Sequence, residues 1–164
     1  MADRVQHILD KLAPVLRDME AWELFGPHEV KSIAKSRRDH EYVLQRRQLT
    51  PNDYYNYLQY ETNLEKLRAI RAFKLQKREK ELKEGGKREV ADAMRRLQAS
   101  NMRHICYVFD RAVRRFPQEF DLWQDYIAFL MRTHSPKLLN AVFARALSLH
   151  PKHTEFWTQA AMHE

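Results

Sequence analysis

Two ten-residue stretches decide the fold: VFDRAVRRFP at residues 108–117 and VFARALSLHP at residues 142–151. Both carry Phe, Arg, Ala and Pro at the same places, so that Phe109 and Pro117 recur at one common offset as Phe143 and Pro151. A Trp likewise recurs at this offset, as Trp123 and Trp157. Such a period, of roughly 34 residues, is typical of solenoids built from helix hairpins. The sequence therefore predicts an all-α fold in which neighbouring hairpins cover one another's apolar faces.

The composition agrees with this class. The chain of 164 residues contains only 3 Gly and 6 Pro, too few for the turns of an all-β protein. A single cysteine, Cys106, excludes a secreted module held by internal disulfides. The longest apolar run, residues 105–109, is far shorter than the ~20 residues of a membrane span. We expect a soluble, intracellular protein with no membrane contact and no small-molecule substrate.

Start and stop signals predict where the helices lie. Gly26-Pro27 is expected to end a first helix, interrupted by Pro14, and to open a second that runs to about residue 48. Thr50-Pro51 opens a third helix of about 30 residues, which the pair Gly85-Gly86 breaks. Further helices are expected from there to residue 116, over 119–132, over 136–149 and from about residue 154.

An earlier copy of the repeat contains an insertion. Tyr54, Tyr57 and Tyr60 match Trp123, Tyr126 and Phe129, but the stretch from Tyr54 to Phe109 is more than twice as long as that from Trp123 to Phe143. We therefore expect an N-terminal helical pair over 1–50, a first repeat over 51–117 with an insertion over 62–104, and a second repeat over 118–151. Residues 152–164 would start a truncated third repeat, which indicates an N-terminal fragment of a longer array. The expected repeat core is Tyr54, Tyr57, Tyr60, Phe109, Ala112, Pro117, Trp123, Tyr126, Phe129, Phe143, Ala146, Pro151 and Trp157.

The insertion carries the whole charge excess. The net charge is +7, and residues 62–104 hold 13 Lys or Arg against 6 Asp or Glu, which leaves the rest of the chain balanced. Two interpretations stay open: a solvated helix face, or a positive rod that attracts nucleic acid backbone without reading bases, because no exposed aromatic is expected there. The candidate RNA-backbone contacts are Lys66, Arg68, Arg71, Lys74, Lys77, Arg78, Lys80, Lys83, Lys87, Arg88, Arg95 and Arg96.

Catalytic and metal-binding patterns are weak. Gly85-Gly86-Lys87 lacks the spacing and the Ser or Thr of a phosphate loop, His150 and His153 have no evident third metal ligand, and Cys106 lies on an apolar helix as a packed thiol. We expect no enzyme activity, no cofactor and no metal.

The repeat pattern resembles the half-a-tetratricopeptide (HAT) repeat, a family of RNA-processing assemblies. Residues 37–47, RRDHEYVLQRR, with YLQYE at 57–61 and LEKL at 64–67, resemble more closely the family of U3 small nucleolar RNA-associated protein 6, the HAT-repeat subunit of the UtpB subcomplex of the small-subunit processome. The candidate family-motif or partner contacts are Arg37, Arg38, Glu41, Tyr42, Arg46 and Arg47.

This resemblance implies a nucleolar, non-enzymatic scaffold in early pre-ribosomal RNA processing and 18S rRNA biogenesis. It implies WD-repeat propeller proteins as partners, with pre-ribosomal or small nucleolar RNA nearby. The alternatives are a HAT-repeat scaffold of a splicing or mRNA 3′-end complex, and a direct RNA-backbone-binding module. For Arg37, either a surface pair with Glu41 or a buried ionic link between the N-terminal helices and the first repeat fits the sequence.

Overall fold

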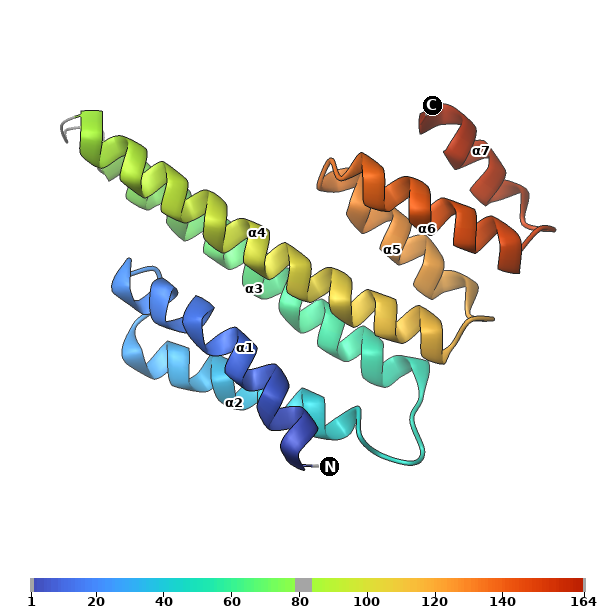
Figure 1. Cartoon of the computed structure of the whole chain (residues 1–164), viewed down its shortest axis with the longest axis horizontal. Coiled ribbons are helices and arrows are strands. Elements are labelled where there is room, and N and C mark those ends of the chain that lie inside the picture. Colours follow the sequence, from blue (N-terminus) through green and yellow to red (C-terminus); the bar gives the residue numbers. More distant parts are fainter. Residues whose placement is uncertain (1, 79–83, 164) are drawn as a thin grey trace. The chain divides into compact units, whose positions relative to one another are not determined.

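A computed structural model describes residues 2–78 and 84–163. These residues form seven helices, which confirms the all-α class (Figure 1). The helices are α1 (Ala2–Ala21), α2 (Pro27–Val43), α3 (Pro51–Arg78), α4 (Glu84–Arg115), α5 (Phe120–Arg132), α6 (Pro136–Leu149) and α7 (Thr154–His163). The chain divides into two compact units, Met1–Ile105 and Cys106–Glu164, and α4 runs from one into the other.

Proline and glycine signals set most helix starts as expected. Pro27 and Pro136 occupy the first turns of α2 and α6, where the missing N–H has no intrahelical partner in any case and the fixed φ fits the helix. The predicted end of the second helix at residue 48 is wrong, because α2 ends at Val43. The amides of Gln45 and Arg46 there bond the carbonyls three residues back, which tightens the chain into turns before Pro51.

Gly26 does not end α1 as expected. Glu23 takes the left-handed conformation instead, with φ 54°, and the Leu24 amide bonds the Met19 carbonyl at 3.0 Å, a Schellman-type C-terminus. Gly26, with φ −71°, is the N-cap of α2, and its amide donates to the Glu29 carboxylate at 2.9 Å. A non-glycine residue therefore supplies the left-handed turn, and the glycine begins the next helix.

The Gly85-Gly86 pair also differs from its expected role. Both glycines lie in the first turn of α4, which begins at Glu84. Helix α3 ends at Arg78, and residues 79–83 lie outside the described part of the chain. The expected long helices are present on either side, with 28 residues in α3 and 32 in α4.

The first unit packs two hairpins around an apolar core. The α1–α2 hairpin lies beside the longer α3–α4 hairpin (Figure 1). The core takes residues from all four helices and from the α1–α2 turn, among them Met19, Phe25, Ile33, Leu64 and Met94. Burial of this surface supplies most of the favourable free energy of the fold. The hairpins thereby hold polar side chains of α2, α3 and α4 at fixed positions.

The second unit is built on stacked aromatics. Phe109 near the end of α4 stacks on Tyr126 of α5, with ring centroids 4.8 Å apart and planes 3° from parallel, and it also contacts Phe129. Trp123 is fully buried, and its indole N–H donates to the Pro117 carbonyl at 3.0 Å. The same bond recurs at the matching positions further along the chain, from Trp157 to the Pro151 carbonyl at 3.2 Å. Both turns that precede the Trp-bearing helices α5 and α7 are therefore closed in one way.

Within residues 2–78 and 84–163, every helix is too short or too polar to qualify as a bilayer-spanning segment.

Candidate functional site: a buried ion pair and a basic helical hairpin

A buried ion pair joins α2 to α3. The Arg37 Nε and Nη2 atoms donate to the two carboxylate oxygens of Glu61 at 2.8 and 2.9 Å, and the two side chains are only 0% and 1% exposed. Of the two interpretations that the sequence left open for Arg37, the structure contains the buried link. A bidentate pair fixes the relative orientation of its two side chains. Because both groups are buried, loss of either one would leave the other charged group without water to solvate it.

Aromatic and imidazole groups surround this pair. His104 of α4 places Nε2 3.6 Å from Glu61 Oε1 and 3.0 Å from the Tyr57 hydroxyl, and His40 of α2 stacks on Tyr57 with centroids 4.8 Å apart. Burial by itself raises the pKa of the Glu61 carboxyl, but the Arg37 guanidinium and His104 outweigh it, so that the pKa lies well below its ordinary value. Burial lowers the pKa of His40. Helices α2, α3 and α4 thus meet at one ionic cluster.

The expected partner contacts near Arg37 separate into two groups. Arg37 and Glu41 are both fully buried, so a partner protein cannot reach them directly. Both side chains instead belong to the interior of the first unit. Arg38 and Tyr42 are about half exposed, and Arg46 and Arg47 are exposed in the turns after α2. The partner role remains a candidate for these four residues only.

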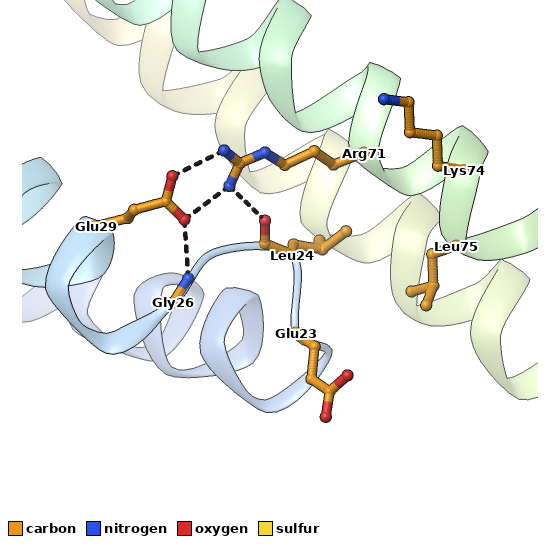
Figure 2. Close-up of a pocket in the computed structure, with 7 residues that line it drawn as sticks. All are labelled: Glu23, Leu24, Gly26, Glu29, Arg71, Lys74 and Leu75. Carbon is orange, nitrogen blue, oxygen red and sulfur yellow. Dashed lines mark hydrogen bonds and ion pairs between the residues drawn. The ribbon is translucent and has the colours of Figure 1, made fainter.

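A second ion pair lies at the α1–α2 turn. Arg71 of α3 donates to both Glu29 oxygens at 2.8 and 2.7 Å and to the Leu24 carbonyl at 2.8 Å, and it covers the Phe25 ring at 4.6 Å. Figure 2 shows this fork and the Gly26 amide that bonds the same carboxylate. The bond from Arg71, helped by that from Gly26, lowers the pKa of Glu29 to about 2.

An open cavity of about 310 Å³ adjoins the second ion pair. Its lining is Glu23, Leu24, Gly26, Glu29, Arg71, Lys74 and Leu75. Arg71 and Glu29 of this lining already satisfy each other, so a ligand in the cavity would have to compete with that ion pair.

Two of the twelve candidate phosphate contacts are therefore structural. Arg68 is 3% exposed and donates to both Glu65 oxygens at 2.8 and 2.6 Å, while Asn101 of α4 bonds the same carboxylate at 2.9 Å. Arg71 is held by Glu29 as described. Because a phosphate would have to displace these carboxylates, Arg68 and Arg71 are withdrawn from the candidate set.

Six candidates lie on the surface of the basic hairpin. Lys66, Lys74 and Lys77 are exposed on α3, and Arg88, Arg95 and Arg96 are exposed on α4, where Arg95 makes an exposed pair with Asp92 at 3.4 Å. Lys80 and Lys83, and the side chains of Arg78 and Lys87, lie outside what the structure describes.

The expectation that this segment exposes no aromatic is wrong. Phe73 is 68% exposed, and Leu67 and Ile70 are 40% and 55% exposed. The helical positions of these three residues indicate their exposure. The buried stripe continues through Leu64, Arg68 and Ala72, and residues 67, 70 and 73 fall on a different side at about 100° per residue.

The expected repeat-core residues are mostly interior. Those that are buried are Tyr54, Tyr57, Phe109, Ala112, Trp123, Tyr126, Phe129, Phe143 and Ala146. Tyr60 and Pro117 are partly buried, and Pro151 is exposed. Trp157 is 53% exposed, although its indole makes the same kind of bond to the Pro151 carbonyl as the buried Trp123 makes to Pro117, and Phe156 is the buried aromatic of α7.

Reactive groups lie in unreactive settings. Burial raises the pKa of the Cys106 thiol to about 11, so the nucleophilic thiolate is scarce near neutral pH. His150 Nε2 lies 2.9 Å from the Pro117 carbonyl oxygen, which can only accept, so this nitrogen carries a proton and is no metal ligand. Among the described residues, no group of three or more His, Cys, Asp or Glu is placed to hold a metal ion.

Known proteins resemble the chain along its whole length. U3 small nucleolar RNA-associated protein 6 of Schizosaccharomyces pombe is 34% identical over 164 residues, which is all of this chain and 31% of that protein. The human homolog is 30% identical over 164 residues, 25% of its own length, and the Dictyostelium discoideum homolog is 27% identical over 162 residues, 24% of its length. The chain thus spans less than a third of the curated relatives it matches.

A family model covers both ion pairs and most of the basic hairpin. The model described as U3 small nucleolar RNA-associated protein 6 matches residues 9–96, a span that contains Arg37, Glu61 and Arg71. This match takes in more than half of the 164 residues, and the chain therefore belongs to the U3 small nucleolar RNA-associated protein 6 family.

Proposed function

We propose that this chain serves in the processing of pre-ribosomal RNA, as part of a non-enzymatic scaffold that associates with the U3 small nucleolar ribonucleoprotein. The observation that carries the proposal is the family match over residues 9–96, together with relatives that are named for their association with U3 small nucleolar RNA. Nucleolar location, a role in 18S rRNA biogenesis and WD-repeat partner subunits of the small-subunit processome are parts of this proposal.

The scaffold is proposed to be an α-solenoid of HAT repeats. The paired bonds from Trp123 to Pro117 and from Trp157 to Pro151, at matching positions of two successive stretches, support a repeating unit. The proposed organisation keeps an N-terminal pair over 1–50, a first repeat over 51–117 with its insertion at 62–104, a second repeat over 118–151 and the start of a third over 152–164. Helix lengths support the insertion, because α3 and α4 have 28 and 32 residues whereas α5 and α6 have 13 and 14.

A nuclease-treated pull-down tests the scaffold function. The tagged protein is expressed in the cells that make it, and its bound proteins and RNAs are identified with and without ribonuclease. We expect enrichment of U3 small nucleolar RNA before treatment and retention of protein partners after it. Loss of every protein partner on treatment would favour RNA binding over scaffolding, and no enrichment of U3 RNA under either condition would refute the assignment to pre-ribosomal RNA processing.

A second candidate function is direct contact with RNA backbone. The exposed cations Lys66, Lys74 and Lys77 on α3 and Arg88 and Arg96 on α4 favour it, since basic side chains on a hairpin attract phosphate regardless of base sequence.

Salt dependence tests this second function. Changing Lys66, Lys74 and Lys77 together to Gln should weaken binding of a single-stranded RNA and reduce the salt slope by about 0.7 for each phosphate that is no longer neutralised. The matched control changes the exposed Lys11, Lys31 and Lys35 of α1 and α2 to Gln, which removes the same charge elsewhere. Equal effects of the two triple variants would show that net charge alone is responsible.

A further inference from the structure

An apolar ridge runs along one side of α3. Leu67, Ile70 and Phe73 stand three residues apart and are 40%, 55% and 68% exposed, so they project from successive turns on adjoining parts of the helix surface. The buried side of α3, which carries Leu64, is occupied by the core of the first unit. Scattered exposed apolar residues are common, but three on successive turns of one helix form a contiguous surface of the kind found at interaction sites.

The part of α3 that carries this ridge is basic and contains no acidic residue. Residues 66–78, KLRAIRAFKLQKR, contain six Lys or Arg and no Asp or Glu. Arg68 and Arg71 point to Glu65 and Glu29 and are neutralised there. Lys66, Lys74 and Lys77 remain exposed. Lys66 and Lys74 each lie four positions from Ile70, and Lys77 lies four positions from Phe73, which puts them beside the ridge. Within the described part of the chain, no carboxylate pairs with these three lysines.

The two aliphatic residues decide what kind of partner fits. A nucleic acid base can stack on Phe73, and its backbone can satisfy the lysines, but the polar sugar-phosphate chain leaves less apolar surface for Leu67 and Ile70 than a protein segment does. A protein helix with an apolar stripe covers all three side chains, and carboxylates beside that stripe meet the lysines. Charge complementarity and aliphatic burial therefore favour a protein segment over RNA.

We propose that the α3 ridge of Leu67, Ile70 and Phe73, with Lys66, Lys74 and Lys77, is a docking surface for an acidic amphipathic helix of a partner protein. The proposal rests on the scaffold function proposed above and assigns it a surface and a partner chemistry. Burial of the ridge supplies affinity, and the lysines orient the partner and speed its association. Binding should therefore weaken when either the ridge is made polar or the salt concentration is raised.

Site-specific photo-crosslinking in the full-length protein identifies what touches the ridge. A photoreactive phenylalanine derivative replaces Ile70, or the exposed Ala99 of α4 as the matched control, in the cells that make the protein. The crosslinked segment is then sequenced by mass spectrometry. We expect position 70, and not position 99, to join a protein segment that has apolar residues at helical spacing and an excess of Asp and Glu.

The captured segment, made as a synthetic peptide, is then titrated against the chain. Ile70→Ser and Phe73→Ser should each weaken its binding about tenfold or more, as expected for a large apolar side chain that is buried on binding. Ala99→Ser should leave binding unchanged. Because all three positions are exposed, the helical content and melting temperature of the variants should match those of the parent chain.

Three crosslinking outcomes would overturn the proposal: a ribonuclease-sensitive crosslink from position 70 to RNA, a crosslink to a second copy of this chain, or no crosslink. In the titration, a peptide that binds the Ile70→Ser variant as tightly as the parent would overturn it too. The scaffold function is tested separately. If the Ile70→Ser protein still enriches U3 RNA and all its partners, only the docking surface is refuted, whereas loss of U3 enrichment by the parent protein refutes the function itself.

Discussion

Removing one partner of the buried Arg37–Glu61 pair should strongly destabilise the first unit. The substitution Glu61→Gln keeps the shape of the side chain but removes its charge and replaces one acceptor by a donor. Burial lowers the pKa of the Arg37 guanidinium and in the native chain Glu61 outweighs it. Arg37 stays charged in the variant too, because a guanidinium is not deprotonated in proteins at neutral pH. The variant therefore leaves a guanidinium that is 0% exposed without the carboxylate that pairs with it.

The expected loss follows from that burial. Removing one partner of a buried pair costs about 3–5 kcal/mol, far more than an exposed pair contributes, since the remaining charge cannot be rehydrated. For a chain of this size the loss corresponds to a fall in Tm of about 6–20 °C. Replacing both residues, as in the double variant Arg37→Met with Glu61→Leu, should cost much less than either single change, because neither member of the pair is then left buried without the other.

Urea titration followed by circular dichroism at 222 nm measures these changes in unfolding free energy. The matched control is Asp92→Asn, which breaks the exposed pair with Arg95 and should change the unfolding free energy by less than about 1 kcal/mol. A loss below about 1 kcal/mol for Glu61→Gln would refute the reasoning, since the pair would then behave like an exposed one that water reaches. A double variant as unstable as the sum of the single variants would refute it too.

Three further predictions concern other parts of the chain. Phe109→Ala should lower the unfolding free energy of the second unit by about 3–5 kcal/mol, seen in the fluorescence of the buried Trp123. Phe73→Ala on the surface of α3 should change the unfolding free energy by less than about 0.5 kcal/mol. Similar effects at both positions would contradict the assigned burial. Stability should fall on acidification below about pH 4.5, because the pKa values of Glu61 and Glu29 are lower in the folded chain than the ordinary 4.5, that of Glu29 being about 2. The unfolded chain therefore takes up protons first, and urea titrations from pH 7 to pH 3 that show no decline would contradict this. Iodoacetamide should alkylate Cys106 far more slowly at pH 8 than it alkylates a free thiol. A pKa of about 11 in place of 9.0 lowers the fraction of thiolate about a hundredfold. Equal rates would contradict the burial of the thiol.

Local chemistry made most helix boundaries predictable, and tertiary structure decided the others. The prolines at positions 27 and 136 act through their own φ and missing N–H, so the starts of α2 and α6 follow from the sequence. The end of α1 does not, because the left-handed residue is Glu23 and no glycine marks it. The end of α2 at Val43 depends on turn hydrogen bonds that no apolar pattern announces.

The candidate site was predictable only in outline. The charges near Arg37 suggested an ionic link as one of two possibilities, but the choice of Glu61 depends on how α2 and α3 pack, with the two partners separated by 24 positions in the chain. Counting positive residues could not separate Arg68 and Arg71, which serve the interior, from Lys74 and Lys77, which face solvent. Burial makes that distinction, and burial is set by neighbours that lie far away in the sequence.

The two hairpins differ in length, and the difference falls on both helices of the longer one. Helix α3 has 28 residues against 13 in α5, and α4 has 32 residues against 14 in α6. At about 1.5 Å per residue each extension reaches about 22–27 Å. Because both helices are longer by similar amounts, the added turns of one can pack on those of the other, and Ala72 of α3 with Val90 and Met94 of α4 indeed share the apolar core of the first unit.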